Sequence, residues 1–222
     1  NVQPRVTFLV SYFDGKKSDL IETLTAIQNL IGRNWETLVI TDPDEETQDL
    51  PENFKMDARI SFLSLNDLNF DDAINGEFVV FCKAGDRFKK SLLNYFYASV
   101  SKDEPADWIY YDCEYINNKT SETLPLFKPP SLSPSMLLSV NYISRGFVRA
   151  SFVKESFEKY QNKHRPVAIE YALALHLHET NRKVRHIPKL LVNQKDLSTP
   201  ETPEISTIIG GHLSDLGLED IS

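Results

Sequence analysis

Short apolar runs, rich in β-branched and aromatic residues, recur along the first half of the chain. Runs of this kind predict buried β-strands. They are Val6–Tyr12, Thr37–Thr41, Ile60–Leu65, Glu77–Lys83 and Asp107–Asp112. The segments between several of these runs are longer and carry apolar residues at helical spacing, so strands and helices are expected to alternate.

Two helices are predicted between these strands. The first follows the Asp14–Gly15 turn, with Ser18 as its N-cap and Gly32 at its end, and the second spans Lys89–Val100. The apolar face of the first helix comprises Leu20, Leu24, Ile27 and Ile31. Alternating strands and helices predict a mainly parallel sheet with helices on both faces. Ligands of such sheets bind where the carboxyl ends of the strands open into a crevice, so residues that follow strands are the first site candidates.

The second half of the chain has a less regular pattern. Leu124–Pro134 contains four prolines and predicts an extended loop. After it we expect a short strand at Phe147–Ala150, a helix at Val167–Glu179 and a last strand at Lys183–Ile187. A closing helix is expected to begin at Thr202–Pro203.

Composition narrows the class of protein. The 222 residues are 41% hydrophobic, which suffices for a packed core, and no repeat or clear linker divides them, so residues 1–222 are interpreted as one domain. The net charge of -8 argues against nucleic-acid binding, which relies on Lys and Arg to neutralise phosphates. No apolar run reaches the ~20 residues of a transmembrane helix. Because the first residue is Asn1, we expect the chain to be excised from a longer protein.

Cysteine usage indicates the compartment. Cys82 and Cys113 both lie in or beside apolar runs. Two cysteines make neither a disulfide framework nor, alone, a zinc site. They are expected to be reduced thiols in the core of a cytoplasmic protein.

The order of several short motifs resembles the family 2 glycosyltransferases. VTFLVSYFDG and WETLVITDPD are similar to the family's first two strands and the turns that follow them, and AINGEFVVFCKAGD is similar to the entry into its Asp-x-Asp strand. DWIYYDCEYINN, FKPPSLSPSMLLSVNYI and KVRHIPKLLVNQK resemble a subgroup that assembles bacterial cell-surface polysaccharides and glycoproteins. The likeness covers roughly Arg5 to Lys195. It implies the GT-A fold, an α/β fold with a mainly parallel sheet.

The resemblance also implies a reaction. The family transfers a sugar with inversion from a nucleoside-diphosphate donor to an acceptor, here a glycan or glycoprotein. A divalent cation, Mg²⁺ or Mn²⁺, screens the diphosphate, whose negative charge grows in the transition state. A carboxylate acts as the base that deprotonates the acceptor hydroxyl.

Two residues match the family's nucleoside contacts. Asp42 falls on the second Asp of the Asp-Asp-Gly-Ser turn and is expected to contact the nucleobase; the alternative is a solvated turn aspartate. Tyr12 falls on the family's Tyr beside the base, and the alternative is an aromatic residue that packs on the core at the strand end. The Asn that usually follows this Tyr is Phe13 here.

The Asp-x-Asp position departs most from the family. The aligned run is Lys83-Ala84-Gly85-Asp86, so a single acidic residue remains. In one alternative Asp86 holds a weakly bound Mg²⁺ or Mn²⁺ together with the diphosphate. In the other, Lys83 pairs with the diphosphate directly and replaces the metal. An exposed lysine at the strand end is the third interpretation of Lys83.

Glu170 falls on the family's base position, near the start of the predicted Val167–Glu179 helix. The second acidic residue of that motif is Ala172 and its Arg is His176. The alternative for Glu170 is a glutamate that the helix dipole favours in a first turn. Two functions therefore stay open: an active glycosyltransferase, and a catalytically inactive GT-A homologue that serves as a binding or scaffold module in a glycosylation complex.

Overall fold

The computed structural model describes residues 3–13, 15–43, 50–100, 105–116, 120, 122–160, 165–180, 182–195 and 203–217. The predicted Asp14 turn, most of the acidic loop after Asp42, and Thr202 lie outside these ranges. Within them, no helix combines the length and the apolarity that a membrane span needs.

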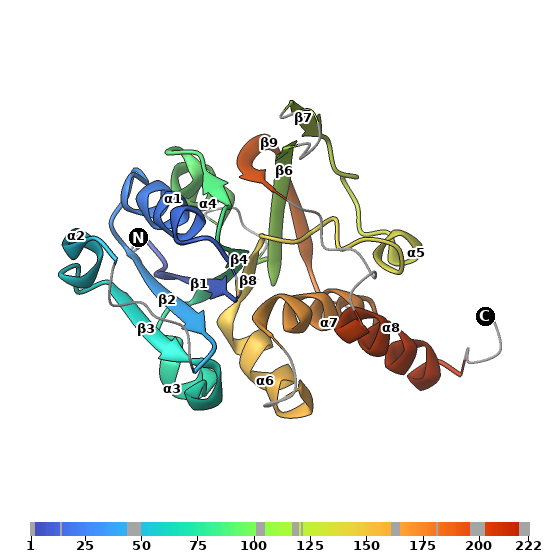
Figure 1. Ribbon diagram of the computed structural model, residues 1–222. Helices are drawn as coiled ribbons and strands as arrows, with labels where there is room; N and C mark the ends of the chain where they lie inside the picture. Colours follow the sequence, from blue (N-terminus) through green and yellow to red (C-terminus); the bar gives the residue numbers. More distant parts are fainter. Residues whose placement is uncertain are drawn as a thin grey trace.

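The strands are β1 (Val6–Tyr12), β2 (Trp35–Thr41), β3 (Ile60–Ser64), β4 (Phe78–Lys83), β5 (Arg87–Phe88), β6 (Trp108–Ile116), β7 (Thr123–Leu126), β8 (Phe147–Arg149) and β9 (Val184–Gln194). The helices are α1 (Lys17–Gln28), α2 (Glu52–Lys55), α3 (Phe70–Ala73), α4 (Leu92–Val100), α5 (Pro134–Leu137), α6 (Ala150–Tyr160), α7 (Pro166–Glu179) and α8 (Pro203–Asp215), with a 3₁₀ turn at Leu65–Asp67. Figure 1 shows their arrangement around the sheet.

All the strands belong to one sheet with the order β3-β2-β1-β4-β8-β6-β9-β5, and β7 pairs with the edge of β6. The pairs β3–β2, β2–β1, β1–β4 and β6–β9 are parallel. The short strand β8 runs antiparallel to both β4 and β6 and joins the two parallel parts. The prediction of a mainly parallel sheet is confirmed.

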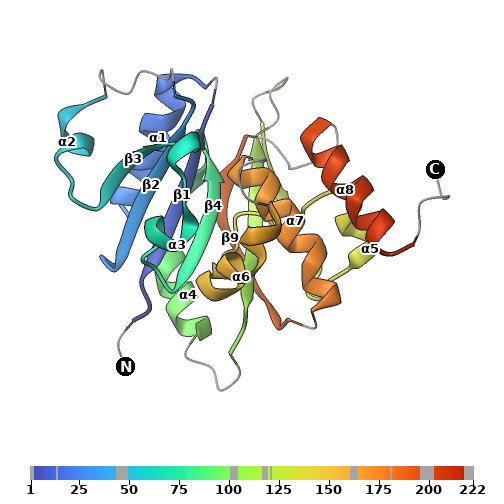
Figure 2. The same cartoon turned by 90° about the horizontal axis from the view of Figure 1, so that it is seen from below.

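Side chains of the central strands alternate between two cores, one on each face of the sheet. In β1, Phe8 and Val10 pack with α1 and α4, whereas Leu9 packs on the opposite face with α3, α6, α7 and α8. Figures 1 and 2 show α1 and α4 on one face and α6 and α7 on the other. Strands buried on both faces explain the nearly continuous apolar runs in the sequence.

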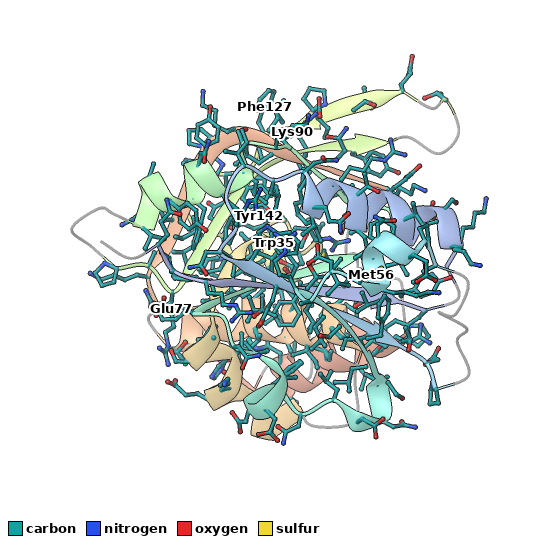
Figure 3. All side chains as sticks on the ribbon, turned by 90° about the vertical axis from the view of Figure 1, so that its left-hand side faces the viewer. Trp35, Met56, Glu77, Lys90, Phe127 and Tyr142 are labelled. Carbon is teal, nitrogen blue, oxygen red and sulfur yellow. The ribbon has the colours of Figure 1, made fainter. Side chains whose placement is uncertain are left out.

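Trp35 and Tyr142 are buried, whereas Met56 and Phe127 are exposed (Figure 3). Phe127 directly follows β7, and within the described residues β7 pairs with β6 alone.

Several predicted boundaries are corrected. The first helix begins after Lys16 rather than Ser18 and ends at Gln28, so Ile31 lies beyond it and is 54% exposed. The proline-rich stretch is not a loop throughout, because Thr123–Leu126 pairs with β6 and α5 begins at Pro134. Proline is tolerated at both places, since an edge strand and a first helical turn each leave a backbone N–H unused. The strand predicted at Lys183–Ile187 continues to Gln194, and the pattern gave no sign of α6.

Candidate functional site

A cavity of about 520 Å³ lies at the carboxyl ends of β1 and β4. The first turns of α7 and α8, which run beside each other in Figure 2, form its other wall. Its lining comprises Ser11, Phe13, Gly15, Lys83, Ala84, Arg165, Val167, Ala168, Pro203, Glu204 and Ile205. This is the place where a parallel α/β sheet is expected to bind its ligand.

The alternation along β1 decides which of its last residues reach the cavity. Tyr12 points to the α1 face and is part of that core, with only 5% of its surface exposed. Ser11 and Phe13 point to the α7 face and line the cavity. Ser11 is buried, and its hydroxyl has no hydrogen-bond partner among the described residues.

Arg165 connects four elements at the mouth of the cavity. Its guanidinium lies over the Phe13 ring, 4.5 Å from the ring centroid, and 3.6 Å from the carboxylate of Asp42, which follows β2. Its backbone N–H donates to Oε1 of Glu204 in the first turn of α8, at 2.7 Å. Arg165 itself is the residue just before α7. Sequence reasoning missed Arg165, because it follows a segment without a recognisable motif.

Lys83 ends β4 and lines the cavity from a tight turn, Lys83–Asp86. Within the turn, Oδ2 of Asp86 accepts the Lys83 N–H at 2.8 Å. Gly85 has φ 102°, a conformation that favours glycine, and its N–H donates to Oγ1 of Thr23 in α1 at 2.8 Å. The turn thus holds the backbone of Lys83 against both the sheet and α1.

Arg145 lies beneath this turn as a fully buried cation. Its Nε donates to Oδ2 of Asp86 at 2.7 Å, and its backbone N–H donates to Oε1 of Glu170 at 2.7 Å. Its carbonyl accepts a hydrogen bond from the hydroxyl of Tyr111. Arg145 adopts φ 63°, an uncommon conformation for a residue with a side chain. Asp86, Arg145 and Glu170 together are called the buried charge cluster below.

The Glu170 carboxyl has no exposed surface. Its Oε2 lies 4.0 Å from Nη1 of Arg145, too far for a hydrogen bond, and has no hydrogen-bond partner among the described residues. Burial raises the pKa of Glu170 from 4.5 to about 8, although Arg145 acts to lower it. The low-dielectric surroundings therefore favour the protonated carboxylic acid at neutral pH.

A second buried polar group joins β6, β9 and the chain after β7. Oδ1 of Asp112 accepts the Lys128 N–H at 2.9 Å and lies 2.8 Å from Nε2 of His186. The Lys128 ammonium donates to the carbonyl of Ser144 at 3.3 Å, and burial lowers its pKa. Because Ser144 precedes Arg145, this group also fixes the backbone that carries the buried cation.

The five site residues predicted from the sequence lie in the cavity lining, at its rim, or buried in the protein. Lys83 lines the cavity, and Asp42 lies at its rim beside Arg165. Asp86 and Glu170 are close together but buried beneath it. For Tyr12 the interpretation as a core aromatic is the one that the structure supports, and Phe13 takes the place beside the cavity.

The geometry bears on two assignments, Glu170 as base and Asp86 as metal ligand, and both stay predictions. A base must come within hydrogen-bond reach of the acceptor hydroxyl, and the Glu170 carboxyl is enclosed by protein. A divalent cation needs oxygen atoms that it can reach, and Asp86 is 1% exposed with Oδ2 already bonded to Lys83 N–H and to a guanidinium. Among the described residues no cluster of three or more His, Cys, Asp or Glu side chains could hold a metal ion. In the part of the chain that the structure describes, the side chains do not fit the Mg²⁺ or Mn²⁺ ion that the resemblance implies.

Comparisons with known proteins give a structural likeness alone. No protein-family model matches the sequence, and a search of curated proteins finds no match. The fold is similar to a crystal structure of S. aureus TarS residues 1–349, with TM-score 0.68 and 14% identity over 98% of this chain and 67% of that one. The same TarS segment in complex with UDP gives TM-score 0.66 and 14% identity, covering 94% of this chain and 65% of that one. The TarS segment in complex with UDP-GlcNAc gives TM-score 0.68 and 13% identity, covering 98% of this chain and 68% of that one.

The chain spans 40% of the longer crystal structure of TarS, again with TM-score 0.68 and 14% identity. At this level of identity the likeness establishes the fold, and function must be argued from the site.

Proposed function

We propose that this chain, which has the GT-A fold of glycosyltransferases, binds a nucleoside-diphosphate sugar in the cavity at the ends of β1 and β4 and transfers the sugar with inversion to a glycan or glycoprotein acceptor. The observation that carries the proposal is the cavity itself, at the carboxyl ends of neighbouring parallel strands and with a lysine in its wall. The UDP and UDP-GlcNAc complexes of the structurally similar TarS support this choice of ligand.

The size and the lining of the cavity suit such a ligand. Its volume of about 520 Å³ is in the range of small-molecule sites, roughly 300–1,000 Å³. The Phe13 ring offers an apolar surface for a base or sugar. Lys83 brings positive charge, which a diphosphate requires. We assign the nucleoside to the side of Phe13 and Asp42, and the diphosphate to the side of Lys83.

Lys83→Ala is expected to weaken the binding of UDP or a UDP-sugar by about tenfold or more, since a cation beside a diphosphate in a partly enclosed site contributes more than 1.4 kcal/mol. Isothermal titration calorimetry of the purified chain measures the change. Lys90→Ala is the matched control: Lys90 is exposed, lies outside the cavity lining, and is in the same segment. Equal UDP affinities for the two variants would show that Lys83 does not contribute to nucleotide binding.

Transfer is tested separately from binding. The chain is incubated with UDP-, GDP- and dTDP-sugars, and release of the nucleoside diphosphate is followed with and without candidate glycan acceptors. Turnover that Lys83→Ala lowers and Lys90→Ala leaves unchanged supports the transferase. A lack of binding to every donor in the panel would contradict the whole proposal.

A second function, a catalytically inactive binding or scaffold module, is favoured by one specific observation. The two carboxylates that match the family's catalytic positions, Asp86 and Glu170, are buried around Arg145 instead of facing the cavity. Among the described lining residues the single acidic side chain is Glu204, which already accepts the Arg165 N–H. Donor binding without turnover on any acceptor supports the module.

A further inference from the structure

The buried charge cluster is enclosed by protein and contains one close ion pair, between Arg145 and Asp86. Asp86, Arg145 and Glu170 are each 1% exposed or less, and they come from the β4–β5 turn, the segment before β8, and α7. Charges are removed from water in this way only when partners compensate for the lost solvation. Arg145 provides that compensation by two donors at 2.7 Å, one to each carboxyl group.

The position of Arg145 opposes the binding of a metal ion at Asp86. A divalent cation binds carboxylate oxygens at about 2.0–2.6 Å. Oδ2 of Asp86 already accepts from Nε of Arg145 and from Lys83 N–H, at 2.7 and 2.8 Å. A cation on this carboxylate would therefore lie beside a guanidinium in a low-dielectric interior, where like charges repel strongly.

The backbone is arranged to keep the guanidinium there. Arg145 is the single non-glycine residue with positive φ in the described part of the chain, at 63°. A conformation of this kind costs about 1–3 kcal/mol and persists where surrounding contacts enforce it. Those contacts are the bond from Arg145 N–H to Glu170, the bond from Tyr111 to the Arg145 carbonyl, and the neighbouring Ser144 carbonyl that Lys128 holds.

We infer that Arg145 acts as an internal counter-cation that takes the place of a divalent metal ion in this site. It neutralises the carboxylate of the Lys83–Asp86 turn from beneath, so that this carboxylate adds little negative charge beside a ligand on Lys83. Nucleotide binding by this chain is consequently independent of metal. The inference rests on the proposed function for the identity of its ligand. The absence of a divalent metal ion at Asp86 can be tested without that ligand. Arg145 is a positioning residue, since it does not line the cavity.

The first experiment uses the unaltered chain. UDP affinity is measured by calorimetry in EDTA and in millimolar Mn²⁺, and Mn²⁺ uptake without nucleotide is measured by electron paramagnetic resonance. We expect the two UDP affinities to differ by less than about threefold, and Mn²⁺ to remain free in solution. Specific Mn²⁺ uptake, or a loss of UDP affinity of about tenfold or more in EDTA, overturns the inference.

The second experiment removes the guanidinium. Arg145→Met is expected to lose UDP affinity in EDTA and to recover part of it on addition of Mn²⁺, because Asp86 is then unpaired. Arg145→Lys, which keeps a cation, should recover metal independence at least in part. Arg87→Met is the control, since Arg87 lies in the adjoining strand but pairs with Glu22 at the surface. A purely structural role would lower affinity equally with and without Mn²⁺, and that result contradicts the inference.

These measurements separate two kinds of failure. If the unaltered chain binds no nucleotide at all, the proposed function fails, and the Mn²⁺ titration still decides whether the cluster excludes a metal. If Arg145→Met does not fold, as judged by circular dichroism, the titrations on the unaltered chain decide the question by themselves.

Discussion

Asp86→Ala should lower the free energy of unfolding by about 3–5 kcal/mol, because it leaves the buried guanidinium of Arg145 without its carboxylate partner. It also removes the acceptor of the Lys83 N–H and so loosens the turn. At roughly 2–4 °C per kcal/mol for a chain of this length, the melting temperature should fall by roughly 6–20 °C. Urea unfolding followed by circular dichroism, together with thermal melts, measures both quantities.

Two controls separate burial from ion pairing as such. Glu22→Ala breaks the Arg87–Glu22 pair, which has the same 2.7 Å separation but side chains 45% and 39% exposed. We expect that variant to lose at most about 1 kcal/mol. Asp86→Asn keeps an acceptor for the Lys83 N–H. Its loss of unfolding free energy should lie between those of Asp86→Ala and Glu22→Ala. Equal losses for Asp86→Ala and Glu22→Ala would contradict the description of a buried charge cluster.

Glu170→Gln should remove a large part of the pH dependence of stability. Because burial raises the pKa of Glu170 from 4.5 to about 8, the folded state holds this proton more tightly than the unfolded state does. The corresponding stabilisation is fully present below pH 4.5 and is lost as the pH rises through about 8. Gln cannot ionise, and its amide oxygen can still accept the Arg145 N–H. The variant should therefore equal the unaltered chain near pH 5 and exceed its stability by several kcal/mol near pH 9.

The measurement is a series of urea titrations from acid to alkaline pH on both proteins, with the difference in unfolding free energy plotted against pH. Glu52→Gln serves as the control, since Glu52 lies at the surface with a side chain 75% exposed. A flat difference plot for Glu170→Gln would show that Glu170 is ionised in the folded protein. That result would also reopen its assignment as a base.

The two predictions concern neighbouring buried carboxyl groups, Asp86 and Glu170, which have different contacts with Arg145. Asp86 receives the guanidinium at 2.7 Å, whereas Glu170 receives a backbone N–H and no hydrogen bond from the guanidinium, whose Nη1 lies 4.0 Å from Oε2. The cluster is then close to neutral when Glu170 is protonated, which fits a site enclosed by the sheet and α7. An acceptor in the cavity does not reach the enclosed Glu170 carboxyl in this conformation, so the assignment of Glu170 as base stays a prediction.

The hydrophobic pattern determined the order of the main elements and the class of the fold. Runs such as Val6–Tyr12 and Phe78–Lys83 could be recognised because a strand buried on both faces admits few polar residues. The same pattern gave the place of the site, since the ends of parallel strands meet at one edge of the sheet. The structure has Lys83 in the cavity lining and Asp42 beside Arg165, and the contacts of both residues with a ligand stay predictions.

The tertiary structure alone decided which residues face the cavity and which are enclosed. A motif alignment put Tyr12 beside the ligand, yet the pleat turns it into the core and turns Phe13 toward the cavity. Arg145 lies 59 residues from Asp86 and 25 from Glu170 along the chain, so no local period could reveal that they meet. Spacing along the sequence indicates which residues share a face of a strand or a helix. Burial and charge pairing depend on segments that only folding brings together.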